Sequence, residues 1–193
     1  MPSPAIESQP DLLHMLVQDH LLSRSVLDAM EQRCVQERAG RPLQVAFWLQ
    51  VLDYFDGYFD RVHHCVEDEL LLPRLALEGF AANGSDVRQM MQEHERMTSF
   101  RQHLRHALGQ RARGGLHAIV QAFVALHRQH LAHEEQHVFA LVRTMLSKAV
   151  QYELAQDLEL RAAANASERA AAELLVASLR QQVDRAPPTQ PRS

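Results

Sequence analysis

The chain has 193 residues, enough for one domain with an appendage and for a sizeable hydrophobic core. Its formal net charge of −4 provides no large basic surface, so the composition argues against a nucleic-acid-binding protein. No apolar run reaches the roughly 18 residues of a membrane span, and the first residues lack the basic and apolar regions of a signal peptide, so we expect a cytoplasmic protein that does not enter a membrane.

Four long segments with helical periodicity follow one another, separated by short breaks. The first runs from about residue 11 to 38 and the second from about 42 to 77, starting at a proline that suits the first helical turn. The third covers about 86–111 and the fourth about 116–146. Connections this short join antiparallel neighbours, so the sequence predicts an all-α, up-down-up-down four-helix bundle over residues 10–146.

An additional C-terminal helix is expected after the bundle, as a separate element over residues 147–185. Ser147 is a suitable N-cap for it. Its middle is rich in alanine and charged residues and has a narrow apolar stripe. It could pack on the bundle, form a homodimer or bind a protein partner through residues 148–185, or stand off as an arm. The tail, 186–193, is predicted to be disordered.

Two stretches repeat one arrangement of histidine and glutamate. In RVHHCVEDELLLP, His63 and Glu67 are four residues apart, and in RQHLAHEEQHVFAL the same spacing separates His130 and Glu134. Residues four apart lie on the same face of a helix, one turn from each other. The two halves of the chain therefore each present a His-x-x-x-Glu pair.

The helix before each of these pairs adds one more histidine directly after an acid. These dipeptides are Asp19-His20 in the first segment and Glu93-His94 in the third. The whole chain thus reads as two helical hairpins, and each hairpin carries a single histidine followed by His-x-x-x-Glu.

These polar residues fall on the apolar stripes of their helices. In the fourth segment the stripe comprises Leu116, Ile119, Phe123, Leu126, His130, Glu134, His137, Leu141 and Met145. An unpaired buried carboxylate is costly, and a metal ion removes that cost. Imidazole and carboxylate together suit iron, manganese or zinc. We therefore predict a dinuclear metal centre, with two bridging glutamates, formed by His20, His63, Glu67, His94, His130 and Glu134.

The remaining histidines are expected to play lesser roles. His137, on the predicted stripe, is the candidate for a seventh ligand or a proton shuttle. His64 and His133 are predicted to flank the site. The others are expected at the surface or in an interface, namely His14, His103, His106, His117 and His127.

The stretches HHCVEDELLLP and HLAHEEQHVF, with the earlier DH and EH, resemble the hemerythrin-like HHE cation-binding domain family. The usual pattern of that family is HHxxEE and then HxxxEE, each followed by a short LFP-like segment. The resemblance covers about residues 10–146 and implies two iron ions, bridged by carboxylates, inside a four-helix bundle. It implies the same six ligands, with Glu67 and Glu134 as the bridges. Spacing alone does not distinguish iron from manganese or zinc.

One departure from the oxygen-carrying members bears on the expected function. Those proteins place a histidine pair four apart in the third helix, whereas Met90 and Thr98 stand one turn to either side of His94. The chain is more similar to bacterial relatives with fewer histidines. We expect a protein that binds or processes a small diatomic or peroxide ligand, either O2, NO or peroxide, in sensing, detoxification or oxygen binding.

Two other functions remain open at the level of the sequence. One is an iron-responsive storage or signalling module that acts on a protein partner through the C-terminal helix. The other is a bundle without metal that only scaffolds a partner, which leaves the six polar core residues unexplained. No catalytic residue is identified, so the sequence does not decide whether the protein is an enzyme.

Overall fold

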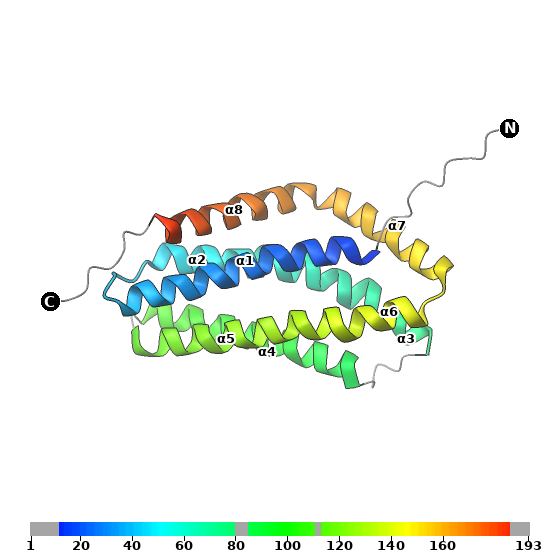
Figure 1. The fold of residues 1–193 in the computed structure, drawn as a ribbon, viewed down its shortest axis with the longest axis horizontal. Coiled ribbons are helices and arrows are strands. Elements are labelled where there is room, and N and C mark those ends of the chain that lie inside the picture. The colour runs from blue at the N-terminus through cyan, green and yellow to red at the C-terminus, as the bar shows by residue number, and fades with distance from the viewer. Residues whose placement is uncertain (1–11, 80–84, 111–112, 186–193) are drawn as a thin grey trace.

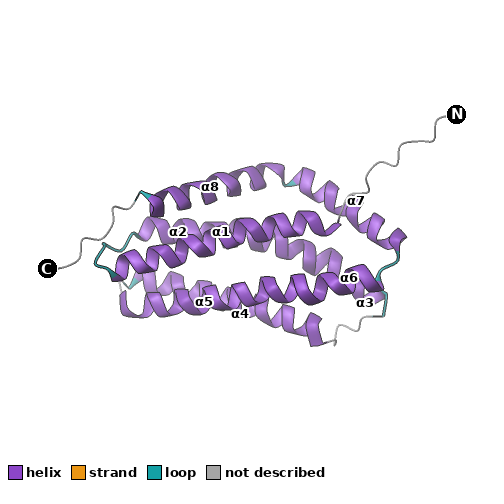
Figure 2. Ribbon diagram, in the orientation of Figure 1, coloured by secondary structure: helices purple, strands orange, loops and turns teal. Residues whose placement is uncertain are grey.

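The structure is a computed structural model that describes residues 12–79, 85–110 and 113–185. These residues form helices and short loops, and no strand occurs among them (Figure 2). The predicted tail, 186–193, lies outside the described residues. None of the helices in the described ranges is both long and apolar enough to cross a membrane.

Four antiparallel helical rods make up the bundle, which confirms the predicted all-α architecture (Figure 1). The first rod is α1 (Leu12–Arg38), and the third is α4 (Ser85–Gly109). The other two rods each join α-helical and π-helical pieces. The second consists of α2 (Val45–Tyr54), η1 (Phe55–His64), η2 (Glu67–Leu71) and α3 (Leu72–Leu77). The fourth consists of α5 (Arg113–His133), η3 (Glu134–Val138) and α6 (Phe139–Met145).

The hydrophobic core is divided into two clusters by a layer of polar side chains. One cluster includes Trp48, Phe55, Met97 and Phe123, and the other includes Leu16, Leu75, Met90, Phe139 and Val142. Along each rod, the predicted ligand lies between the residues of the two clusters. We call this level of the bundle the polar layer, defined by the six predicted ligands.

Within the described ranges, η1 runs from the first apolar cluster into the polar layer, and η2 and η3 begin in the layer at Glu67 and Glu134. These π-helical segments change which residues face inward. A π-turn bonds each N–H to the carbonyl five residues earlier and thereby adds one residue to the turn. In the fourth rod the buried positions after Glu134 are Val138, Phe139, Val142 and Leu146. The prediction that His137 and Met145 continue the core stripe is wrong, since both are exposed, whereas Leu141 is half-buried and packs against the second apolar cluster. A helix that stayed regular would place His137 inward, but the π-turn of η3 leaves it exposed.

The C-terminal segment forms two helices, α7 (Lys148–Ala164) and α8 (Ala166–Asp184), instead of the single helix expected. They separate at Asn165, whose side-chain Nδ2 donates to the carbonyl of Arg161 at 2.9 Å. Asparagine is a poor helix former, because its side chain competes for backbone groups in this way. Both helices pack on the bundle, α7 against α1 and α8 against α1 and α2 (Figure 1). Homodimerisation or partner binding through residues 148–185 stays a prediction.

The start of α7 is fixed as the sequence predicted. Ser147 is the N-cap, and its side-chain oxygen accepts a hydrogen bond from the backbone N–H of Val150 at 3.3 Å. This bond satisfies one of the amide groups that lack a partner in the first helical turn.

Replacing Ser147 with alanine should therefore lower the free energy of unfolding by about 1 kcal/mol, measured by urea denaturation of the full chain. Ser99→Ala is the control, because Ser99 is exposed in the interior of α4, where alanine is the better helix former. A loss of stability for Ser99→Ala equal to that for Ser147→Ala would contradict the capping role.

Candidate metal centre

The six predicted ligands come together in the polar layer from all four rods. α1 supplies His20, α4 supplies His94, and the two composite rods each supply one His-x-x-x-Glu pair. Five of the six residues are buried with at most 1% of their surface exposed. The side chain of His94 is the exception, with 11% exposed. The assignment of these residues as ligands remains a prediction, and their placement fits it.

The first group of converging atoms comprises His20, His63, Glu67 and Glu134, whose donor atoms lie within 4.8 Å of one another. The Nε2 atoms of His20 and His63 are 3.2 Å apart. His20 Nε2 lies 3.1 Å from Glu134 Oε2, and His63 Nε2 lies 3.2 Å from Glu67 Oε1. A single cation could contact all four side chains.

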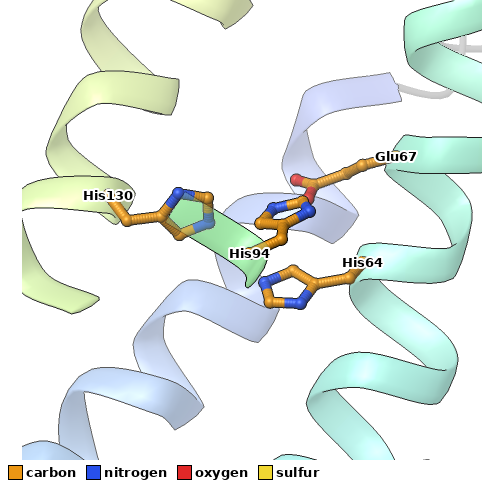
Figure 3. A group of neighbouring side chains, drawn as sticks. All are labelled: His64, Glu67, His94 and His130. Atoms are coloured by element: carbon orange, nitrogen blue, oxygen red, sulfur yellow. The ribbon is translucent and has the colours of Figure 1, made fainter. Parts of the chain in front are cut away.

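The second group comprises His64, Glu67, His94 and His130, again within 4.8 Å (Figure 3). Their side chains point toward one another from three rods (Figure 3). His94 Nε2 lies 3.6 Å from Glu67 Oε2, and His130 Nε2 lies 3.3 Å from the Oε1 atom of Glu134. The second group therefore lies against the same two glutamates as the first.

Each glutamate offers one oxygen to each group. For both Glu67 and Glu134, one carboxylate oxygen lies near a histidine of the first group and the other near a histidine of the second. None of these four buried oxygens accepts a hydrogen bond from any residue in the described ranges. Buried carboxylates without hydrogen bonds are costly. A pair of cations, bridged by both carboxylates, would satisfy all four oxygens.

The outer nitrogen of every predicted histidine ligand faces a carboxylate. In each case Nδ1 faces the acid and Nε2 faces a glutamate of the layer. The Nδ1–carboxylate pairs are His20–Glu135 at 2.8 Å, His63–Asp19 at 3.4 Å, His94–Asp68 at 3.5 Å and His130–Glu93 at 3.1 Å. Such a carboxylate fixes the orientation and tautomer of an imidazole that binds a metal. The donor set is thus oriented for metal binding by its surroundings.

These outer acids follow the internal repeat of the sequence. Asp19 and Glu93 precede the two single histidines. Each of these acids faces Nδ1 of the histidine in the next rod of the same half. The acids that follow Glu67 and Glu134, namely Asp68 and Glu135, each face Nδ1 of the single histidine of the other half. The Asp-His and Glu-His dipeptides are visible in the sequence, but the role of their acids is not, because their partners lie on other helices.

The charges of the layer favour a bound cation. Burial lowers the pKa of His20, but the carboxylates of Glu134 and Glu135 outweigh it and hold that pKa above its usual value. Burial likewise opposes protonation of His63, yet Glu67 and Asp19 raise its pKa well above the usual range. The excess of negative charge around these imidazoles would attract a divalent cation in the same way.

His64 lies inside the second group and not at its flank, where the sequence predicts it. Its Nδ1 donates to Asp60 Oδ1 at 2.9 Å, and its buried Nε2 has no hydrogen-bond partner in the described ranges. Burial, aided by neighbouring histidines, lowers its pKa well below the usual value, so it is neutral, as a metal ligand must be. The His-His dipeptide was the available signal. The wider turn of η1 brings both members inward.

His127, expected at the surface or in an interface, lies inside the bundle. It is fully buried, and its Nε2 lies 2.9 Å from Ser23 Oγ. Its ring packs among aromatic side chains, including Phe55 and Phe59. Its position three residues before His130 places it on the inner face, and that spacing could have identified it. His127 belongs to neither group of converging donors.

A surface cleft reaches the second group between α3 and α4. It has a volume of about 460 Å³, and its walls include Asp68, Leu72, Met91 and His94. Because His94 also belongs to the second group, the cleft connects that group to the surface. The first group has no exposed histidine.

Glu67→Gln should abolish most of the stabilisation that a divalent cation gives the full chain, because it removes one bridging charge while keeping the size of the side chain. For the unchanged protein, a cation at one hundred times its dissociation constant should stabilise by about 3 kcal/mol, measured by thermal unfolding with and without Co²⁺. Glu37→Gln is the matched control. Glu37 is a buried carboxylate outside the layer, where it accepts from Arg33 Nε at 3.0 Å and Trp48 Nε1 at 3.2 Å. Equal loss of the cation effect in both variants would contradict the bridging role.

His64→Ala should leave one metal position intact and weaken the other by about tenfold or more, since an imidazole of the second group is lost. The measurement is the number and affinity of Co²⁺ ions bound per chain, by titration of the protein. His103→Ala, at an exposed position of α4, should bind Co²⁺ as the unchanged chain does. Unaltered Co²⁺ binding by His64→Ala would contradict a ligand role for His64 and support its predicted place at the flank of the site.

Comparison with known proteins identifies the family. Residues 11–142 match the family described as "Hemerythrin HHE cation binding domain". Searches of curated proteins and of solved structures gave no significant match. The matched range covers more than half of the chain and contains the six predicted ligands and His64. The chain therefore belongs to the hemerythrin HHE cation-binding domain family.

Proposed function

We propose that this protein holds two iron ions in the polar layer and binds or processes a small ligand there, namely O2, NO or peroxide. One observation carries the proposal. Glu67 and Glu134 are buried, accept no hydrogen bond within the described ranges, and each turn one oxygen toward each of two histidine groups. That arrangement matches the needs of two neighbouring cations and has no other evident use.

The donor set supports iron as the metal. Imidazole and carboxylate donors suit iron, manganese or zinc, whereas soft thiolate sites select other ions. Neither cysteine belongs to the converging groups. Iron is also the ion implied by the resemblance to hemerythrin-like domains. Manganese or zinc in both positions is the outcome that would replace this part of the proposal.

The side chains of the layer would hold and orient the metals and limit what reaches them. A bound pair of irons would supply two adjacent Lewis-acid and redox centres for a small ligand. The Phe139 ring stacks on His20 with centroids 5.6 Å apart, and the Phe59 ring stacks on His63 at 4.4 Å. These rings cover one side of the first group. Because the first group is buried and has no exposed histidine, it suits a small ligand better than a large substrate.

The second candidate function is an iron-responsive storage or signalling module that acts on a protein partner through the C-terminal helices. The packing of α8 on α1, α2 and η1, beside the His20–His63 group, favours it. A simple carrier of a small ligand does not need such a cover. Iron-dependent ordering of α7 and α8 without turnover of peroxide would support the module, and turnover by the iron-loaded protein would support chemistry at the metals.

Full-length protein purified from iron-replete cells should contain two iron ions per chain, because both groups have a complete donor set. Elemental analysis gives the metal content, and the change in the absorption spectrum on adding NO or peroxide tests ligand binding. Glu67→Gln should lower the iron content, and Glu37→Gln should not. No bound metal in the unchanged chain would overturn the proposal and favour a scaffold that binds a partner. Bound iron without any spectral response would retain the metal centre and reject the ligand.

A further inference from the structure

The C-terminal helix α8 reaches the polar layer through one side chain. Arg169 Nη1 donates to Asp19 Oδ1 at 2.6 Å and lies 3.3 Å from Tyr58 Oη. Tyr58 Oη itself donates to Asp19 Oδ1 at 2.7 Å. Asp19 is buried, with 6% of its surface exposed, and is thus held by a cation and a phenol at once.

The other oxygen of Asp19 holds a predicted metal ligand. Asp19 Oδ2 accepts from His63 Nδ1 at 3.4 Å, while His63 Nε2 faces Glu67 Oε1. A continuous set of polar contacts therefore runs from Arg169 through Asp19 to His63. Arg169 and Asp19, the first pair in this set, are 150 positions apart in the sequence.

The internal repeat provides a comparison for this contact. Glu93 occupies the position of Asp19 in the second half of the chain, and its carboxylate faces Nδ1 of His130. It accepts from Gln89 Nε2 at 2.9 Å, and His133 Nδ1 lies 3.8 Å from it. Both of these partners belong to the bundle, because Gln89 lies in α4 and His133 ends α5. The arginine from outside the bundle distinguishes the first half from the second.

A small cavity marks the junction between α8 and the first group. Its volume is about 40 Å³, and it is lined by residues that include Asp19, Tyr58, His63, Leu158 and Arg169. That space can hold one or two water molecules. The docking of α7 and α8 therefore encloses the outer side of His63, which solvent would otherwise reach.

We propose that Arg169 is a positioning residue for the His20–His63 metal position, acting through Asp19, and that docking of α8 and occupation of this position favour each other. The inference rests on the proposed function, since it requires a bound metal. An acid that is fixed in place fixes the imidazole it contacts, and loss of such an acid typically weakens metal binding by about ten- to a hundredfold. Because coupling between two sites is reciprocal, a metal bound at His63 also stabilises the docked α8.

The plain alternative is that Arg169 only attaches α8 to the bundle. Another interhelical pair provides the control, since Arg74 of α3 donates to Glu153 of α7 at 2.6 Å. This pair attaches α7 to the bundle and touches no residue of the polar layer. Arg74→Ala therefore removes an attachment of the C-terminal helices without altering the surroundings of His63.

The test is a titration of the full chain with Co²⁺, followed by the visible absorption of the bound ion. Arg169→Ala should weaken one of the two binding steps by about tenfold and change the absorption bands of that ion alone. Arg169→Lys should restore part of the affinity, because it keeps a positive charge near Asp19. Arg74→Ala should bind both ions as the unchanged chain does.

Hydrogen exchange of residues 166–184, measured with and without Co²⁺, tests the reciprocal effect. Cobalt should slow exchange in α8 of the unchanged chain and of Arg74→Ala, and should slow it much less in Arg169→Ala. Two cobalt ions bound by Arg169→Ala with unchanged affinities and spectrum would overturn the inference and leave the proposed function standing. Equal weakening by Arg74→Ala and Arg169→Ala would also overturn it, because attachment alone would explain both. Failure of the unchanged chain to bind cobalt would overturn the proposed function, and the inference with it.

Discussion

The burial of two carboxylates at the middle of the bundle is the constraint on which the rest of the structure depends. Glu67 and Glu134 lie where apolar side chains would normally pack, and their oxygens accept no hydrogen bonds from the described residues. Such groups persist only beside positive charge. The surrounding histidines, their outer acids and the shift to π-helical turns all serve to bring cationic or metal-binding nitrogens to those oxygens. The two apolar clusters then provide the stability that the polar layer does not.

Much of this arrangement could be predicted from the sequence, because it depends on the spacing of residues within single helices. A separation of four residues puts His63 on the face of Glu67, and the same spacing in the second half shows that neither pair arises by chance. The apolar stripes of α1 and α4 are regular, so the inward positions of His20 and His94 followed from them. The family resemblance rests on the same residues and agrees with the match over residues 11–142.

The rest could not be predicted, for two physical reasons. A π-turn changes the helical repeat without a clear signal in composition, so a regular repeat placed His137 inside and His64 at the flank, whereas the structure has the reverse. Contacts between distant parts of the chain leave no local pattern at all. The Arg169–Asp19 pair joins α8 to α1, and only the packing of a helix with a narrow apolar stripe brings the two together.

The division of the core into two apolar clusters also has a consequence for the alignment of the helices. Sliding one rod along its neighbour by a single turn, about 5.4 Å, would move its histidine or glutamate out of the layer and against phenylalanine or leucine. In coiled coils a single buried polar residue selects one register in this way. The polar layer of this bundle thus sets the axial register of the helices, in addition to its candidate role in binding metal. Selection on either property would preserve the same few side chains. An apolar substitution in the layer would allow the rods to pack in shifted registers.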